Sequence, residues 1–265
     1  MEKTARILGR EGDASEYAEI ADNISKAFVG EFVKPDGTVA TNTQTGYLLA
    51  LDFDVLPENL RQKSFEKLVE KLASDNWYLD TGFVGTPLLN RVLSRFGRHD
   101  IAVRLLLNEE YPSWLYPIKQ GATTMWERWN SYSHKDGFGS AAMNSFNHYS
   151  YGAVGEWMYR NIGAIAPDPE NAGYKNIIFA PKLSQKINAA YAFYETPYGR
   201  AESSWKIVGG EMSWGITVPP NATATVEIPA ENADSVRVNG EKPKSLRLEK
   251  LGCGEYQITI TKPKY

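Results

Sequence analysis

The chain has 265 residues, of which 42% are hydrophobic and 23% charged, a composition typical of folded domains. Single domains usually contain about 100–200 residues, so we expect one large domain or two of moderate size. The 29 basic and 32 acidic residues give a net charge of −3 and form no basic stripe, which argues against nucleic acid as a partner. The sequence has no run of about twenty apolar residues, so we expect no membrane span and no membrane partner.

Cysteine and histidine usage is sparse. Cys253 is the only cysteine, so no disulfide can form within the chain, and no Cys/His cluster offers the ligands of a structural zinc site. We therefore expect no metal and no other cofactor. The N-terminal stretch Met1–Arg6 is charged and leads into no apolar segment of the kind that signal peptides carry. The sequence leaves the compartment open between cytoplasm, periplasm and exterior.

Residues 1–168 show the periodicity of amphipathic helices. The first predicted helix starts at a capping box formed by Asp13 and Glu16. Another starts with Thr86 and Pro87 as N-cap and first helical residue and ends at Gly97. The other predicted helices cover 45–51, the segment from Pro57 to Leu72, 100–107 and 146–162. Aromatic and glycine-rich connections separate them over 75–85, 111–129 and 131–145. Connections of that length are usually functional or disordered, and their aromatic content argues against disorder. Helix hairpins that carry such connections predict part of an (α/α) toroid, since a plain bundle uses shorter links.

Residues 169–265 have the alternating pattern of short strands separated by Gly, Pro and Asn turns. The predicted strands cover 177–179, 186–193, 201–208, 211–218, 224–228, 235–238 and 256–260. The dipeptide Asn239-Gly240 tolerates the positive φ of a tight hairpin turn. We therefore predict an α+β multidomain chain: a partial toroid of helix hairpins over 1–168, then an antiparallel β-sandwich over 169–265, with the boundary in the 167–173 linker.

The segment Gly121–Trp129 places one carboxylate, Glu127, between the indoles of Trp126 and Trp129. An indole offers a flat apolar face to the C–H side of a sugar ring and one N–H to a hydroxyl, and its bulk lowers the polarity around a nearby acid. The pattern is therefore typical of a sugar-cleaving site. An alternative interpretation is a helical core pair at i, i+3, with the glutamate as a solvated flank.

Three motifs in this order, Thr81–Thr86, Gly121–Trp129 and Asn147–Gly152, resemble those of bacterial α-L-rhamnosidases. The resemblance covers nearly all of the chain, including Gln44–Tyr47 and the closing strands. It corresponds to the C-terminal part of the family's catalytic toroid and the β-sandwich that follows. The family's toroid has about twice as many helices as this sequence predicts.

The resemblance implies an inverting glycoside hydrolase that releases terminal α-L-rhamnose from glycans or glycosides. An inverting enzyme uses a general acid and a general base, separated by roughly 6.5–9.5 Å so that a water fits beside the sugar. Glu127 matches the family's base. The family's acid belongs to an acidic loop in the earlier half of the toroid, and this sequence shows no counterpart. We therefore expect a C-terminal fragment that lacks the general acid.

The resemblance also implies a set of substrate-binding residues. His148 matches a position that contacts the sugar, although a packing role is the alternative. Trp126 and Trp129 are expected to line the rhamnose pocket, and the alternative for both is a place in the core. Trp77 and Asp80 lie in another long connection and are expected to add a wall and a hydroxyl acceptor; an equally good interpretation of Asp80 is a loop cap.

Two other functions remain open from the sequence. One is a non-catalytic carbohydrate-binding or assembly module that keeps the aromatic platform. The other is a polysaccharide lyase-like toroid, which Asn147-His148-Tyr149 matches in part. The expected partner is a rhamnose-containing carbohydrate. An incomplete toroid also exposes apolar inner faces, so we expect a homodimer or association with the missing toroid half.

Overall fold

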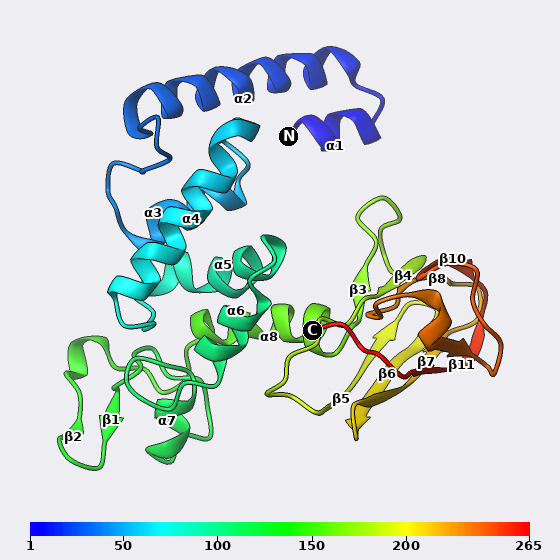
Figure 1. Cartoon of the computed structure of the whole chain (residues 1–265). Helices are drawn as coiled ribbons and strands as arrows, with labels where there is room; N and C mark the ends of the chain where they lie inside the picture. Colours follow the sequence, from blue (N-terminus) through cyan, green and yellow to red (C-terminus); the bar gives the residue numbers. More distant parts are fainter. The chain divides into compact units, whose positions relative to one another are not determined.

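The computed structural model describes residues 1–265, which form two compact units (Figure 1). The first contains residues 1–96 and 104–151, and the second contains residues 97–103 and 152–265. The α-helices are α1 (Glu2–Ile7), α2 (Glu11–Phe32), α3 (Gln44–Asp52), α4 (Glu58–Ser74), α5 (Gly82–Arg95), α6 (His99–Leu106), α7 (Leu115–Lys119) and α8 (Val154–Trp157).

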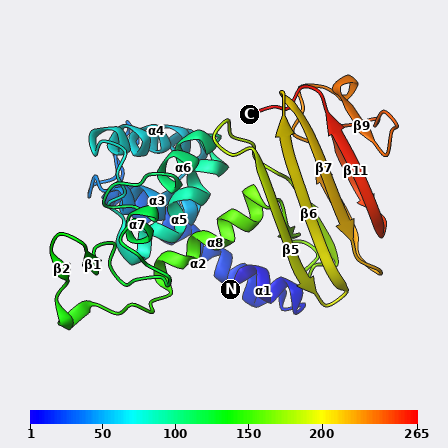
Figure 2. The same ribbon diagram turned by 90° about the horizontal axis from the view of Figure 1, so that it is seen from below.

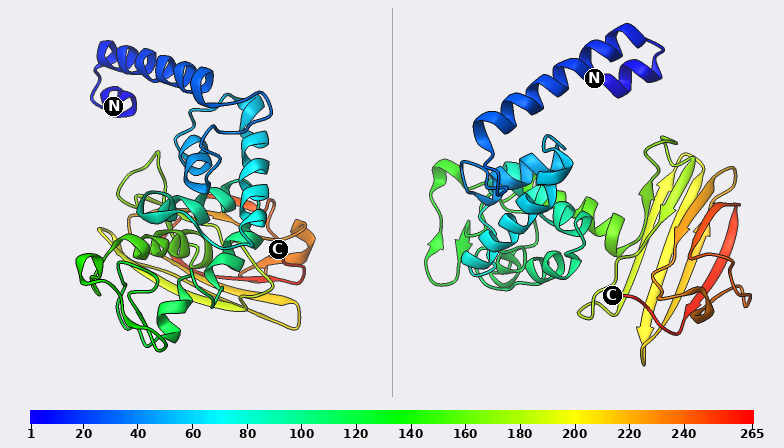
Figure 3. Two further views of the ribbon diagram at one scale, coloured as in Figure 1. Left: turned by 90° about the vertical axis from the view of Figure 1, so that its left-hand side faces the viewer. Right: turned by 45° about the horizontal axis from the view of Figure 1, so that its top comes forward.

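The long helix α2 lies beside the short helix α1 at the start of the chain (Figure 3). The capping box predicted at Asp13 is wrong, because the helix begins at Glu11 after Arg10, without a side-chain cap. Asp13 instead lies within the first turn, where its negative charge suits the helix N-terminus. Ala14 is the one residue that this 22-residue helix buries.

The core of the first unit lies where α3 packs against both α4 and α5. Its fully buried side chains include Tyr47, Leu48, Leu51, Leu68, Leu72, Leu89 and Leu93. Burial of each such leucine contributes about 1.5–3 kcal/mol. The helices predicted after Pro57 and over 45–51 are confirmed, and Thr43 caps α3 by accepting the Gly46 N–H at 3.1 Å.

Helix α5 begins at Gly82, so the start predicted at Thr86 and Pro87 is wrong and both residues lie inside the helix. The first turn of α5 contains two glycines and has low helix propensity, and α3 stabilises it. The Thr45 hydroxyl donates to the Thr81 carbonyl at 2.9 Å. A Cβ at Gly85 would lie 2.4 Å from Thr45 Oγ1. Only glycine therefore lets α5 approach α3 this closely.

The later part of the first unit is largely irregular. It contains α7, the hairpin of β1 (Tyr132–Ser133) with β2 (Gly137–Phe138), and the 3₁₀ turn Ala141–Met143. The helix predicted over 146–162 forms only after residue 149: a 3₁₀ turn over Ser150–Ala153 leads into α8 and the π-helix Met158–Ile162. The prediction was wrong over 146–149.

The second unit contains two main sheets (Figure 2). The strands are β3 (Ala166–Pro167), β4 (Asn176–Phe179), β5 (Ala189–Thr196), β6 (Gly199–Val208), β7 (Glu211–Val218), β8 (Thr223–Glu227), β9 (Val236–Val238), β10 (Arg247–Leu251) and β11 (Gly254–Ile260). One sheet has the order β10-β8-β4-β3 and the other β5-β6-β7-β11-β9. All pairs are antiparallel except β4 with β8, which the sequence did not indicate.

Along β7 and β11, alternation places apolar residues inside the sandwich. Tyr191 and Phe193 of β5 are instead exposed. Phe179 and Trp214 are fully buried, and every second residue of β7 is buried. The hairpin predicted at Asn239-Gly240 is confirmed, since both residues have positive φ (51° and 86°). The residues on either side of this turn, Val238 and Glu241, exchange two backbone hydrogen bonds.

Candidate functional site

Two motifs of the first unit lie side by side. The Glu127 N–H donates to the Ser145 carbonyl at 2.9 Å, and the His148 N–H donates to the Met125 carbonyl at 2.9 Å. Glu127 and His148 are far apart in sequence, and these bonds bring their segments together. The backbone therefore fixes the predicted base close to the predicted sugar-contacting histidine.

The Glu127 side chain is half-buried and oriented by the same neighbouring segment. Its Oε2 accepts the Ser145 N–H at 2.8 Å, so Glu127 and Ser145 are joined by two hydrogen bonds. A bond from a backbone N–H to a carboxylate is charge-assisted and holds the side chain in one rotamer. These two bonds involve Oε2 and the backbone N–H of Glu127 and leave Oε1 outside the pair.

Trp126 and Trp129 are 6% and 8% exposed and lie in irregular chain. The alternative of a helical pair is therefore wrong in its helical part, although both rings belong to the core. Trp129 stacks on Tyr151 with centroids 3.7 Å apart and meets Trp114 edge-on at 5.5 Å, while Trp126 meets Phe146 edge-on at 5.2 Å. Most of each indole surface thus supports the protein, and only a small part is available to a sugar.

His148 lies in non-helical chain and is half-buried. Its ring stacks on Phe83 at 4.7 Å and on Tyr149 at 5.3 Å. Nδ1 accepts the Ser150 N–H at 3.3 Å, which assigns the proton of the neutral ring to Nε2. The Nε2–H group can therefore donate to a sugar hydroxyl.

Trp77 and Asp80 lie in the connection between α4 and α5. Trp77 is half-buried, and the Arg104 guanidinium lies over its ring, 4.5 Å from the centroid. The Asp80 side chain is exposed, while its N–H donates to Gln44 Oε1 at 3.0 Å. The α5 N-cap is Thr81, which makes no side-chain cap bond.

Three neighbours of the candidate residues were not predicted from the sequence. Phe83 was part of the motif Thr81–Thr86 but had no predicted role. Its ring, at the start of α5, stacks on His148 and also contacts Tyr151, with ring centroids 5.3 Å apart. Ser145 acts through its backbone, so no residue pattern could have identified it. Tyr151 could have been found as an aromatic in the last motif, and its carbonyl accepts the Trp114 indole N–H at 2.9 Å.

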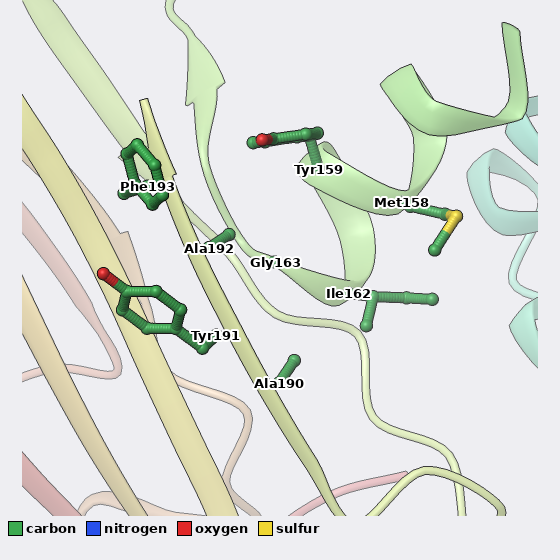
Figure 4. Close-up of a pocket in the computed structure, with 8 residues that line it drawn as sticks. All are labelled: Met158, Tyr159, Ile162, Gly163, Ala190, Tyr191, Ala192 and Phe193. Atoms are coloured by element: carbon green, nitrogen blue, oxygen red, sulfur yellow. The ribbon is translucent and has the colours of Figure 1, made fainter. Parts of the chain in front are cut away.

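One hollow elsewhere in the structure has different chemistry. In the second unit, a hollow of about 300 Å³ between the π-helix and β5 is lined by apolar and aromatic residues such as Met158, Tyr159, Tyr191 and Phe193 (Figure 4). Its lining contains no carboxylate, so it lacks the acid and base that glycoside hydrolysis requires. No three His, Cys, Asp or Glu side chains gather where they could hold a metal ion. None of the helices combines the length and apolarity needed to cross a membrane.

Comparison with known proteins shows which family the chain belongs to. The bacterial α-L-rhamnosidase six-hairpin glycosidase domain matches residues 1–162, and the bacterial α-L-rhamnosidase C-terminal domain matches residues 165–242. The chain belongs to the bacterial α-L-rhamnosidase family. The resemblance predicted from the three motifs is therefore confirmed, as is the order of helical hairpins followed by β-sandwich.

Relatives and solved structures support the family assignment. An α-L-rhamnosidase of Formosa agariphila is 47% identical over 253 residues, which are 94% of this chain and 27% of that protein. The crystal structure of Streptomyces avermitilis α-L-rhamnosidase complexed with L-rhamnose has a TM-score of 0.90 and 39% identity, and covers 98% of this chain and 25% of its own. That of Aspergillus terreus has a TM-score of 0.85, 33% identity and coverage of 97% and 28%. The chain thus spans about a quarter of the length of these rhamnosidases.

Proposed function

We propose that this chain contributes the general base of an inverting α-L-rhamnosidase site, and that Glu127 is that base. The observation that carries the proposal is the orientation of the Glu127 carboxylate by the Ser145 N–H, in a segment bonded to that of His148. The relatives support the substrate class, since they are named α-L-rhamnosidases and one was solved with L-rhamnose.

The proposed reaction has one step at the anomeric carbon. Glu127 Oε1 takes a proton from a water while the oxygen of that water bonds to the anomeric carbon. The glycosidic C–O bond breaks on the opposite face of the sugar. The departing oxygen takes a proton from a general acid, for which this chain has no assigned residue. His148 donates Nε2–H to a sugar hydroxyl, Trp126 and Trp129 bound the pocket, and Trp77 and Asp80 add an outer wall and a hydroxyl acceptor.

The base assignment is tested with p-nitrophenyl α-L-rhamnoside, whose leaving group departs as a stabilised phenolate and needs little protonation. Turnover by the chain is compared with that of Glu127→Gln and Glu127→Ala. Loss of a general base lowers turnover by about 10²–10⁴-fold. Azide, which needs no base, is expected to restore cleavage in the Glu127→Ala variant and to give the rhamnosyl azide of inverted configuration.

The matched control is Glu110→Gln, a change of the same chemistry at an exposed glutamate of the same unit, which is expected to leave turnover unchanged. Titration with L-rhamnose separates binding from chemistry. Binding without turnover in the unmodified chain indicates the carbohydrate-binding module instead of the hydrolase. Neither binding nor turnover, or turnover that Glu127→Gln leaves intact, contradicts the proposal.

The chain is also proposed to associate through exposed apolar surface, either with a second copy or with another part of a toroid. Ile20, Ile24 and Phe32 of α2 are 46%, 59% and 45% exposed. Apolar side chains at helical spacing that remain exposed together usually mark an interaction surface.

A further inference from the structure

The side chain of Gln44, the first residue of α3, is 1% exposed and fully engaged in hydrogen bonds. Its Nε2 donates to Asp75 Oδ2 at 2.8 Å and to the Tyr78 carbonyl at 2.9 Å. Its Oε1 accepts the Asp80 N–H at 3.0 Å. One buried amide therefore binds three points of the connection between α4 and α5.

The orientation of this amide follows from its partners, because two acceptors face the nitrogen and one donor faces the oxygen. Glutamate has the same size but cannot donate when ionised, so of the three bonds it can keep only the one that it accepts from the Asp80 N–H. Asp75 is also held from α4, since Lys71 Nζ lies 2.5 Å from Asp75 Oδ1. Gln44 thus completes a network whose other members lie on α4 and the connection.

The connection needs such support because its backbone is unfavourable. Asn76 and Trp77 have φ values of 55° and 62°, in the left-handed region that residues with a Cβ rarely adopt. Their N–H groups close the end of α4 by donating to the Ala73 and Leu72 carbonyls at 3.0 Å and 2.7 Å. The chain must then turn towards Tyr78 and Asp80, where Gln44 binds it.

The same connection leads directly to the candidate site. Thr45, the neighbour of Gln44, donates to the Thr81 carbonyl at 2.9 Å, which fixes the start of α5. Phe83, in the first turn of α5, stacks on His148 with centroids 4.7 Å apart. A shift of the connection therefore moves the ring that supports His148.

We propose that Gln44 is a positioning residue of the rhamnoside site: it touches no substrate, but its amide sets the 75–81 connection and, through Phe83, the orientation of His148. The inference rests on the proposed function, because that function makes the orientation of His148 matter. Gln44 acts through the two hydrogen bonds that Nε2 donates, and these are the bonds that a test must remove.

The test variant is Gln44→Glu, which keeps the shape and the acceptor for Asp80 but removes both donors and places an anion beside Asp75. The matched control is Gln62→Glu, the same change on the exposed surface of α4. The rescue variant combines Gln44→Glu with Asp75→Asn, so that the amide introduced at position 75 donates to the carboxylate introduced at position 44. The single variant Asp75→Asn is a control that measures the effect of losing the bond between Asp75 and Lys71.

The first readout is independent of any activity. Nuclear magnetic resonance follows the indole N–H signal of Trp77 and the ring C–H signals of His148, assigned with Trp77→Phe and His148→Gln. Gln44→Glu is expected to shift both signals at temperatures well below its unfolding transition. Gln62→Glu is expected to shift neither, and the rescue variant is expected to return them towards those of the unmodified chain.

The second readout is the Kd for L-rhamnose, which Gln44→Glu is expected to raise about three- to tenfold, as coupling through packed side chains does. Unshifted signals and an unchanged Kd in a folded Gln44→Glu chain overturn the inference. If that variant does not fold, the rescue variant decides, because it still lacks the bond to the Tyr78 carbonyl. Signals that stay partly displaced in the folded rescue variant support positioning, and unshifted signals with an unchanged Kd overturn it.

Failure of the proposed function gives a different result. In that case the unmodified chain does not bind L-rhamnose, while the Trp77 and His148 signals still report whether Gln44 sets the connection. A role in folding alone gives a third pattern, with a lowered unfolding temperature but unshifted signals and unchanged Kd, and this pattern also overturns the inference.

Discussion

At the scale of single residues, His99 carries the largest change in proton affinity. It is 9% exposed and packs against Trp157 with ring centroids 5.5 Å apart. Burial, and after it the positive charge of Lys182, lowers the pKa of His99 to about 4. The folded second unit therefore holds a neutral imidazole under conditions in which an exposed histidine is charged.

This difference predicts a pH-dependent stability. Between a pH of about 6.5 and about 4 the unfolded chain binds a proton at His99 and the folded chain does not, so stability falls as the pH falls. The full effect is up to about 3 kcal/mol in the free energy of unfolding. Urea unfolding of the chain and of His99→Gln at several pH values measures it. We expect the free energy of unfolding of the variant to fall less steeply with decreasing pH than that of the unmodified chain. Equal dependence on pH in the two proteins contradicts the prediction.

The candidate site shows how far residue patterns reach. Glu127 and His148 could be proposed from the sequence because motifs preserve the chemistry of side chains, and the structure brings their segments together. Ser145 was missed because its contribution is a backbone N–H, which every residue except proline carries. Phe83 was missed as a neighbour of His148 because stacking depends on the path of the intervening chain.

At the scale of elements, the end of α4 depends on two left-handed residues, of which Asn76 is the first. Asn76 has a φ of 55° and follows the C-cap Asp75. Asparagine tolerates this conformation better than alanine, and glycine tolerates it best. We expect Asn76→Ala to lower the free energy of unfolding by about 1 kcal/mol and Asn76→Gly to leave it unchanged or slightly higher. Thermal unfolding followed by circular dichroism measures both, and an alanine variant as stable as the glycine variant would refute this account.

The same scale separates what periodicity predicts from what contacts decide. The apolar stripe after Pro57 was strong enough to predict α4. The start of α5 was placed too late because its first turn, 82–85, contains two glycines and is stabilised by Thr45 rather than by its own propensity. Residues 146–149 were predicted as helix, but their backbone bonds instead to the segment around Glu127.

At the scale of the whole molecule, the predicted order of a helical part and a sandwich is confirmed because the hydrophobic period changes from about 3.6 to 2 near residue 169. The parallel pairing of β4 with β8 could not be predicted, since each strand pattern is local and the pairing joins residues 47 positions apart, such as Asn176 and Thr223.

Helix α2 argues for association of the whole chain. It buries only Ala14, while Ile20 and Ile24 stay about half exposed, and covering such surface yields roughly 25 cal/mol per Å². We expect light scattering at micromolar concentration to give at least twice the mass of one chain.

Replacement of both isoleucines by lysine is expected to give monomers, because burial of the ammonium groups costs more than the contact yields. Glu19→Lys, an exposed change of charge on the same helix, controls for electrostatic effects. A monomeric unmodified chain contradicts association of two copies through α2, and dimers that survive the double replacement place the contact elsewhere.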